Sequence, residues 1–129
     1  EKAAPVGGEE TILVVDDEET IRSLVKRLLS NAGYTVLLAE SGAEAVEMYR
    51  ERENEIDLVI LDMIMPEMGG QETYERLREI DPNVKVLLSS GYSQNGQAQE
   101  ILEAGVQGFL QKPYDLSQVL YKVREVLDE

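Results

Sequence analysis

Two apolar stretches of the chain end in aspartate. Residues 12–15 are followed by Asp16 and Asp17, and residues 58–61 are followed by Asp62. Carboxylate oxygens are hard ligands that suit Mg²⁺, which proteins commonly hold through one or two carboxylates together with water and phosphate. The three aspartates are therefore candidate magnesium ligands. The alternative is local: acidic residues also favour the first turn of a helix, and an isolated aspartate often occupies a turn.

A hydroxyl and an ammonium group occupy similar places further along the chain. Ser90 follows an apolar stretch at residues 84–89, and Lys112 follows another at residues 108–110. Taken singly, Ser90 could cap a turn and Lys112 could be a solvated surface charge. Beside a magnesium site, both groups would be able to contact the oxygens of a phosphoryl group.

These residues lie at the ends of predicted strands in a regular alternation of strands and helices. Short, β-branched-rich apolar runs predict strands, and an apolar spacing of three or four residues predicts helices. The strands are expected at residues 12–15, 35–39, 58–61, 84–89 and 108–110. The clearest helical stripes are Ile21, Leu24, Val25, Leu28 and Leu29, ending at Gly33, and Leu116, Val119, Leu120, Val123 and Leu127, opened by Asp115 and Ser117. Shorter helices are expected at residues 43–52, 71–80 and 98–104.

Five strand–helix units in one chain indicate an α/β fold with a doubly wound parallel sheet. Continuous apolar strands such as residues 12–15 are typical of strands covered on both faces. Ligands in such sheets bind beyond the carboxyl ends of the strands. Asp16, Asp17, Asp62, Ser90 and Lys112 all fall at those ends, so we expect them to converge on one site.

The composition excludes several other kinds of chemistry. Asp and Glu number 26 against 12 Lys and Arg, so the formal net charge is −14, and Cys and His are absent. Within this chain, disulfides, thiol nucleophiles and histidine-dependent mechanisms are excluded, and phosphate-neutralising contact with nucleic acid is not expected. With no long apolar run, we expect a cytoplasmic protein without membrane insertion. Residues 1–10 are expected to form a flexible tail or linker and residues 11–129 one domain; the start at Glu1 leaves open a piece of a longer protein.

Four segments, read in order, resemble the receiver domain of two-component response regulators. They are ILVVDDEE, LVILDMIMPEMGG, LLSSGYS and GFLQKPY, and the likeness extends from about Thr11 to Leu127. The resemblance implies a flavodoxin-like (βα)5 domain with strand order 2-1-3-4-5. It also implies a signalling module rather than an enzyme, one that assists only its own phosphotransfer and autodephosphorylation.

The resemblance assigns a role to each matching residue. Asp62 is the phosphoacceptor, and Mg²⁺ is held by Asp16, Asp17, Asp62 and the backbone carbonyl of Ile64. Ser90 is the switch hydroxyl, Lys112 contacts the phosphoryl group, and the peptide bond before Pro113 is cis. Phe109 matches the aromatic switch, with an ordinary core aromatic as the alternative. Because the Ile64 side chain offers no hydrogen bond to an attacking water, we expect slow self-dephosphorylation.

The resemblance also implies partners and an output surface. The phosphoryl donor is a histidine kinase or a histidine phosphotransfer protein, which supplies the histidine that this chain lacks. Residues 93–99 carry few apolar side chains, so we expect a mobile segment there that responds to phosphorylation. The output surface, and a possible homodimer contact, would comprise the fourth helix, the fifth strand and the fifth helix.

Other interpretations remain at this stage. An aspartyl-nucleophile phosphohydrolase normally has aspartates two residues apart and a cap domain, whereas Asp16 and Asp17 are adjacent. A nucleotide- or flavin-binding module would need a glycine-rich phosphate loop, and Gly69-Gly70 alone is weak. A pseudo-receiver that binds partners without being phosphorylated is a further alternative. The start GGEETILVVDDEE and the motifs SGYS and KPY favour a receiver at the carboxyl end of a hybrid sensor kinase over a stand-alone regulator.

Overall fold

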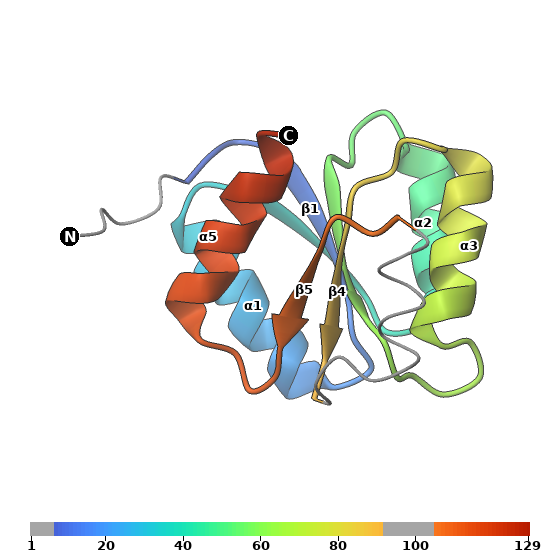
Figure 1. Ribbon diagram of the computed structural model, residues 1–129, viewed down its shortest axis with the longest axis horizontal. Helices are drawn as coiled ribbons and strands as arrows, with labels where there is room; N and C mark the ends of the chain where they lie inside the picture. The colour runs from blue at the N-terminus through green and yellow to red at the C-terminus, as the bar shows by residue number, and fades with distance from the viewer. Residues whose placement is uncertain (1–6, 92–104) are drawn as a thin grey trace.

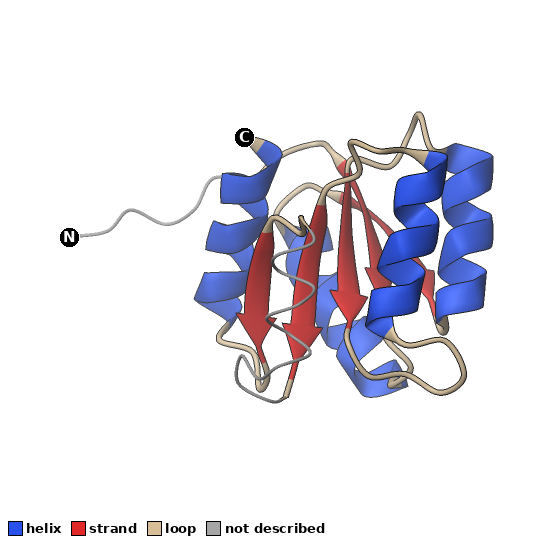
Figure 2. Ribbon diagram, turned by 45° about the vertical axis from the view of Figure 1, so that its right-hand side comes forward, coloured by secondary structure: helices blue, strands red, loops and turns tan. Residues whose placement is uncertain are grey.

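The computed structural model describes residues 7–91 and 105–129. A five-stranded parallel sheet, in the order β2-β1-β3-β4-β5, lies between two helical layers (Figures 1 and 2). The predicted α/β class and the strand order are thereby confirmed. The elements are β1 (Thr11–Val15), α1 (Glu19–Asn31), β2 (Thr35–Ala39), α2 (Gly42–Arg52), β3 (Leu58–Asp62), α3 (Gly70–Ile80), β4 (Val86–Ser90), β5 (Gly108–Gln111) and α5 (Leu116–Leu127). The expected helix at 98–104 and the expected mobile segment at 93–99 lie outside the described residues.

In the described part of the chain, each face of the sheet is covered by two helices. Helices α1 and α5 pack on one face and α2 and α3 on the other (Figure 1). Side chains alternate along a strand, so Ile12 and Val14 enter the α1/α5 cluster while Leu13 and Val15 enter the α2/α3 cluster. All four are at most 1% exposed. This two-sided burial explains why the central strands are continuously apolar.

The helix stripes are partly as predicted. In α1, Val25 and Leu29 are buried, but Leu24 is 40% exposed. An α-helix turns by about 100° per residue, so Leu24 lies that far around the axis from Val25, at the edge of the packed face. Gly33 has a φ of 103° just beyond the end of α1, a conformation that suits glycine.

In α5, the predicted stripe included Leu116 and Leu127 but not Val126. Val119, Val123 and Val126 are the buried residues, and Leu116 is 42% exposed in the first turn. Val126 lies seven residues after Val119, almost directly below it on the helix, which makes it the better core position. Asp115 caps the helix as predicted, because its side chain accepts hydrogen bonds from the backbone N–H groups of Ser117 and Gln118.

Strand β4 begins two residues later than predicted. The backbone N–H of Val84 donates to the carbonyl of Asp81 in a turn, so it is not available to a strand ladder. Val84 is nevertheless buried, which explains why its apolar side chain suggested a strand. At the other end the ladder extends to Ser90, paired with Gln111 of β5.

The segment before β1 is attached to the body of the domain. Arg124 of α5 donates from Nη2 to Glu10 at 2.7 Å and to Asp128 at 2.8 Å, and from Nη1 to the carbonyl of Gly7 at 3.3 Å. The backbone N–H of Gly8 donates to the carbonyl of Ala32. Residues 7–10 are therefore fastened to α1 and α5.

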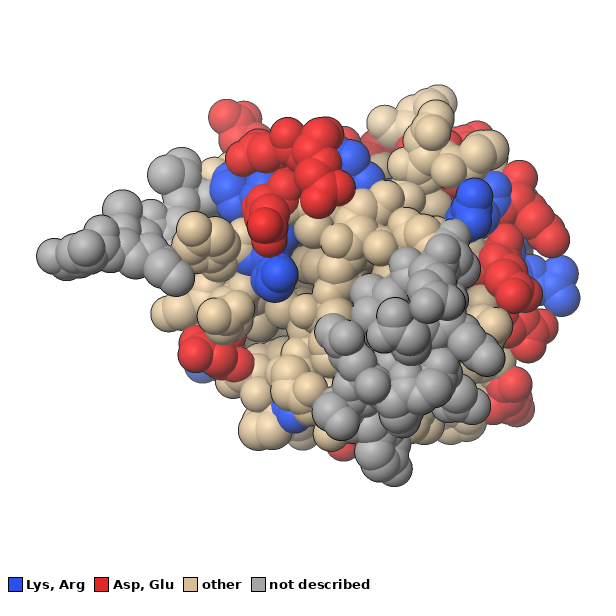
Figure 3. Space-filling view, viewed as in Figure 1, with Lys and Arg blue, Asp and Glu red and all other residues tan. Residues whose placement is uncertain are grey.

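The surface is strongly charged. Acidic side chains gather near the end of α5 and along α3 in the view of Figure 3, with basic side chains interspersed. None of the helices in the described ranges is long and apolar enough to cross a membrane.

Candidate functional site

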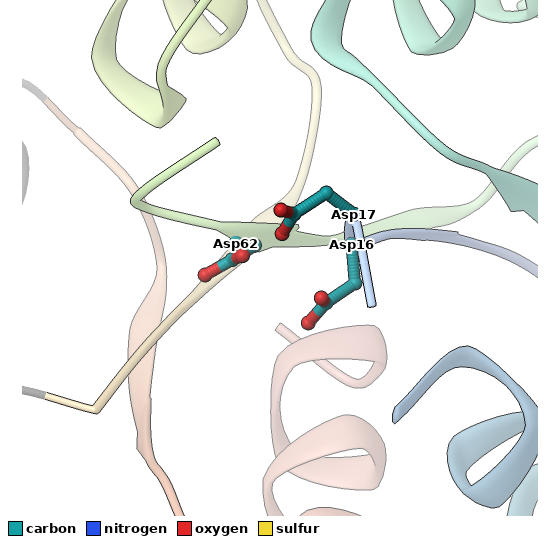
Figure 4. Close-up of side chains that lie close together, drawn as sticks. All are labelled: Asp16, Asp17 and Asp62. Atoms are coloured by element: carbon teal, nitrogen blue, oxygen red, sulfur yellow. The ribbon is translucent and has the colours of Figure 1, made fainter. Parts of the chain in front are cut away.

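Three aspartates lie together at the carboxyl edge of the sheet. Parallel pairing sets Val15 beside Leu61, so Asp16 and Asp17, which follow β1, come next to Asp62 at the end of β3 (Figure 4). Each can place a carboxylate oxygen within 4.8 Å of the others. Asp16 is 1% and Asp62 5% exposed, whereas Asp17 is exposed. This donor set of three carboxylates fits a hard divalent cation such as Mg²⁺.

The backbone around Asp16 is held by neighbouring groups. Asp16 Oδ1 accepts a hydrogen bond from the N–H of Glu18 at 2.9 Å, which begins the turn into α1. The guanidinium of Arg22 donates to the Asp16 carbonyl at 2.7 Å. Glu18 occupies the N-cap position of α1, without a capping hydrogen bond from its side chain, and Glu19 lies in the first turn, so both occupy the helix start as expected. Arg22 was not singled out from the sequence.

Lys112 brings a positive charge into this cluster. Its Nζ lies 2.8 Å from Asp16 Oδ2 and 3.5 Å from Asp62 Oδ1. Its backbone N–H donates to the carbonyl of Ser90 at 2.8 Å, which fixes the start of the loop after β5. Only 16% of the Lys112 side chain is exposed. A partly desolvated ammonium between two buried carboxylates is a strong interaction, because little water screens it.

The cluster shifts the pKa values of Asp62 and Lys112. Burial and the neighbouring charge of Asp16 raise the pKa of Asp62 to about 7, against the opposing effects of Lys112 and the Ile64 N–H. Burial alone would lower the pKa of Lys112, but its hydrogen bond to Asp16 and the charge of Asp62 outweigh this and raise it. At neutral pH Lys112 is therefore positively charged, whereas Asp62 is present in both its protonated and its ionised form.

A cavity of about 430 Å³ opens onto Asp62. It is lined by Asp17, Glu18, Asp62, Ile64, Ser90, Gly91 and Lys112. Ser90 is 1% exposed at the end of β4, and the Ile64 side chain is half exposed beside Asp62. The Ile64 N–H points to Asp62 Oδ1 at 3.5 Å. The structure thus brings together the carboxylates, the hydroxyl and the ammonium that the strand ends predicted.

Phe109 and Pro113 lie away from this cavity. Phe109, on β5, is half-buried against the α2/α3 cluster, and it lines a separate cavity of about 350 Å³ together with Pro113. The peptide bond between Lys112 and Pro113 is cis, as the resemblance implied.

Gly70 shapes the loop that follows Asp62. Its N–H donates to the carbonyl of Met63 at 2.8 Å. A Cβ atom on Gly70 would lie 2.7 Å from the Met63 Cα and 2.8 Å from the Asp62 carbonyl oxygen. Only glycine permits this close approach, so Gly70 lets the chain turn back against the strand that carries Asp62. The pair Gly69-Gly70 was the sequence signal for this turn, although it was considered only as a weak sign of a phosphate loop.

The protein-family model described as the response regulator receiver domain matches residues 12–124 of this sequence. The chain belongs to the response regulator receiver domain family. Sensor kinase CckA of Brucella abortus is 39% identical over 129 residues, which are all of this chain and 14% of the kinase. Chemotaxis protein CheY of Thermotoga maritima is 36% identical over 116 residues, 89% of this chain and 95% of that protein.

Solved receiver structures agree with this assignment. A response regulator receiver domain from Clostridium thermocellum has a TM-score of 0.88 at 31% identity, covering 92% of this chain and 94% of the other. The CheX–CheY complex of Borrelia burgdorferi with BeF3 and Mg²⁺ contains a neighbour with a TM-score of 0.86 at 30% identity, covering 91% and 88%. The receiver domain is a two-component signalling module and not a classical enzyme.

Proposed function

We propose that this receiver domain accepts a phosphoryl group on Asp62 from a phosphohistidine of a partner histidine kinase or histidine phosphotransfer protein. The observation that carries the proposal is a buried carboxylate that lines a surface cavity, with an ammonium 3.5 Å away. Buried charge of this kind is costly unless a ligand compensates it. A phosphoryl group delivered through the cavity would reach Asp62 directly.

The transfer requires little covalent help from the protein. An oxygen of the ionised Asp62 attacks phosphorus, the P–N bond to the donor imidazole breaks, and its electron pair remains on that imidazole. Mg²⁺ bound by Asp16, Asp17, Asp62 and the Ile64 carbonyl would neutralise charge on the phosphoryl oxygens and favour the ionised form of Asp62. Its presence in the related CheX–CheY–BeF3 complex supports this assignment.

Lys112 and Ser90 act on the phosphoryl group that arrives. The Lys112 ammonium, already between Asp16 and Asp62, offers a donor to one phosphoryl oxygen as negative charge accumulates. Ser90 lines the same cavity and offers its hydroxyl to another phosphoryl oxygen. The new charge-assisted hydrogen bond between Ser90, at the end of β4, and the phosphoryl group would displace the loop that follows β4. In this way a local change in charge becomes a conformational change.

The switching surface comprises β5, α5 and the fourth helix, which is expected at 98–104, outside the described residues. Phe109 responds to phosphorylation through changes in its packing alone, since it has no hydroxyl group and lies half-buried on β5. The same surface is the proposed site of homodimer contact. The exposed aliphatic side chain of Ile64 offers no hydrogen bond to an attacking water, so self-dephosphorylation is slow.

The wider context is also a proposal. We favour a cytoplasmic receiver that forms part of a larger sensor kinase, because the match to CckA extends over the whole chain whereas that to CheY covers 116 residues. Direct nucleic-acid binding is not part of the function, because the formal net charge is −14.

Intact mass spectrometry tests the phosphoacceptor. The protein is incubated with acetyl phosphate and Mg²⁺, beside an Asp62→Ala variant and a chelator-treated sample. One phosphoryl increment that requires both Mg²⁺ and Asp62 is the expected result. No increment from acetyl phosphate or from a phosphorylated histidine donor, with the protein folded, would instead support a pseudo-receiver.

A further inference from the structure

A hydrogen bond between two hydroxyl groups links β4 to the loop after β5. Ser89 Oγ lies 2.5 Å from the hydroxyl oxygen of Tyr114. Ser89 is 1% exposed, and the Tyr114 side chain packs against the α1/α5 cluster. Because β4 is pleated, Ser89 faces this cluster while its neighbour Ser90 lines the cavity on the other side.

The link lies close to the reacting groups. Ser89 pairs with Asp62 in the ladder between β3 and β4. Tyr114 is two residues after Lys112, whose own backbone N–H donates to Ser90. The segment from Lys112 to Tyr114 is thus attached to two consecutive residues of β4.

The Tyr114 hydroxyl is also within electrostatic reach of the site. Burial raises its pKa, the Ser89 hydrogen bond and the Lys112 charge oppose this, and the charges of Asp16 and Asp62 add to it. Tyr114 therefore remains a neutral hydroxyl at physiological pH and serves as a hydrogen-bonding group rather than as a charge.

We propose, as an extension of the proposed function, that Tyr114 and Ser89 are positioning residues that hold Lys112 in reach of the phosphoryl group on Asp62. A lysine side chain has four flexible methylene groups, so its ammonium is well placed only if its backbone is fixed. The hydroxyl pair fixes the backbone just beyond Lys112. Without it, Lys112 spends less time where it stabilises the transferring phosphoryl group.

The alternative is that this hydrogen bond only stabilises the core. Tyr49 offers a matched control, because its buried hydroxyl donates to Asp81 Oδ2 at 3.0 Å, and both residues line a cavity separate from that of Asp62. Tyr114→Phe and Tyr49→Phe remove the same group. Melting temperatures of both variants measure the structural cost, and phosphorylation rates measure the effect on Lys112.

The experiment compares initial rates of phosphorylation by acetyl phosphate at saturating Mg²⁺ and at a temperature where all variants are folded. We expect Tyr114→Phe and Ser89→Ala each to slow the reaction by about three- to tenfold, the range of one neutral hydrogen bond. The double variant should be no slower than the slower single variant. In a Lys112→Ala background, Tyr114→Phe should have no further effect, and Tyr49→Phe should retain the wild-type rate.

The outcomes separate this inference from the proposed function. If the wild-type protein accepts no phosphoryl group, the phosphoacceptor function itself is wrong. If the wild type is phosphorylated and Tyr114→Phe keeps its rate while its melting temperature falls like that of Tyr49→Phe, the pair is only structural and the inference is overturned. A full effect of Tyr114→Phe in the Lys112→Ala background would overturn it as well.

Discussion

Replacing Asp62 by asparagine should stabilise the metal-free protein, and the gain should depend on pH. The carboxylate is 5% exposed beside Asp16, and its pKa is raised from 3.8 to about 7. Between those values the folded protein holds a proton that the unfolded chain has released. Stability therefore falls as the pH rises through this window, and the whole cost is present above about pH 7.

The size of the effect follows from the raised pKa. The gap between 3.8 and about 7 corresponds to an upper limit of about 4 kcal/mol. The attraction of Lys112 is already contained in that pKa, and rearrangement and hydration around the buried carboxylate reduce the actual cost of its charge. We therefore expect Asp62→Asn to raise the free energy of unfolding by about 2 kcal/mol at about pH 8, and by much less at about pH 5.

Urea denaturation in the presence of a chelator measures both values. Glu51→Gln, which removes an exposed carboxylate from α2, serves as the control for net charge. Adding Mg²⁺ should stabilise the wild type more than Asp62→Asn, since a ligand that binds only the folded state adds to its stability. If Asp62→Asn is no more stable than the wild type at about pH 8, or gains equally at both pH values, the electrostatic reasoning about this site is wrong.

Three further predictions concern the fold, and the same urea assay tests them. Gly70→Ala should lower the free energy of unfolding by about 1–3 kcal/mol, because the new Cβ meets the backbone of the loop after β3. Gly91→Ala should change it little, since no atom of the described residues lies within 4 Å of the new Cβ, and equal effects of the two changes would contradict the close-approach argument. Asp115→Ala should lower the free energy of unfolding by about 0.5–2 kcal/mol, because α5 loses its N-terminal cap. An unchanged urea midpoint would show that water replaces the lost hydrogen bonds. Val123→Ala should cost about 2 kcal/mol and Leu116→Ala less than about 1, and the reverse order would contradict the observed packing of α5.

The sequence predicted that the candidate site residues lie close together, because strand ends determine where such residues lie. Once residues 12–15 and 58–61 are recognised as neighbouring parallel strands, Asp16 and Asp62 must be adjacent, whatever the loops do. Lys112 follows β5, which is separated from β1 by β3 and β4, so topology places it at the same edge of the sheet and its long side chain spans the remaining distance to Asp16, 2.8 Å from Nζ to Oδ2. Topology therefore accounts for the shared edge of these residues.

The residues that support the site were not predictable in the same way. The contact of Arg22 with the Asp16 carbonyl and that of Tyr114 with Ser89 depend on side-chain length and rotamer, not on strand order. Nothing in their local sequence distinguishes them from surface or core residues. The burial of residues at the edges of the helix faces was mispredicted for a related reason. Apolar spacing shows that α1 has a buried face, but it does not show that Leu24 lies at the margin of that face.

The attachment of Arg124 to Glu10 has a consequence for how the domain can be joined to other segments. Helix α5 runs opposite to the strands, so its last turn and residues 7–10 meet at the end of the sheet remote from Asp62 (Figure 1). Segments joined before β1 and after α5 would thus both connect to the domain next to the contact between Arg124 and Glu10. A partner can approach Asp62 without meeting either connection, and a rotation of α5 would carry the entering segment with it.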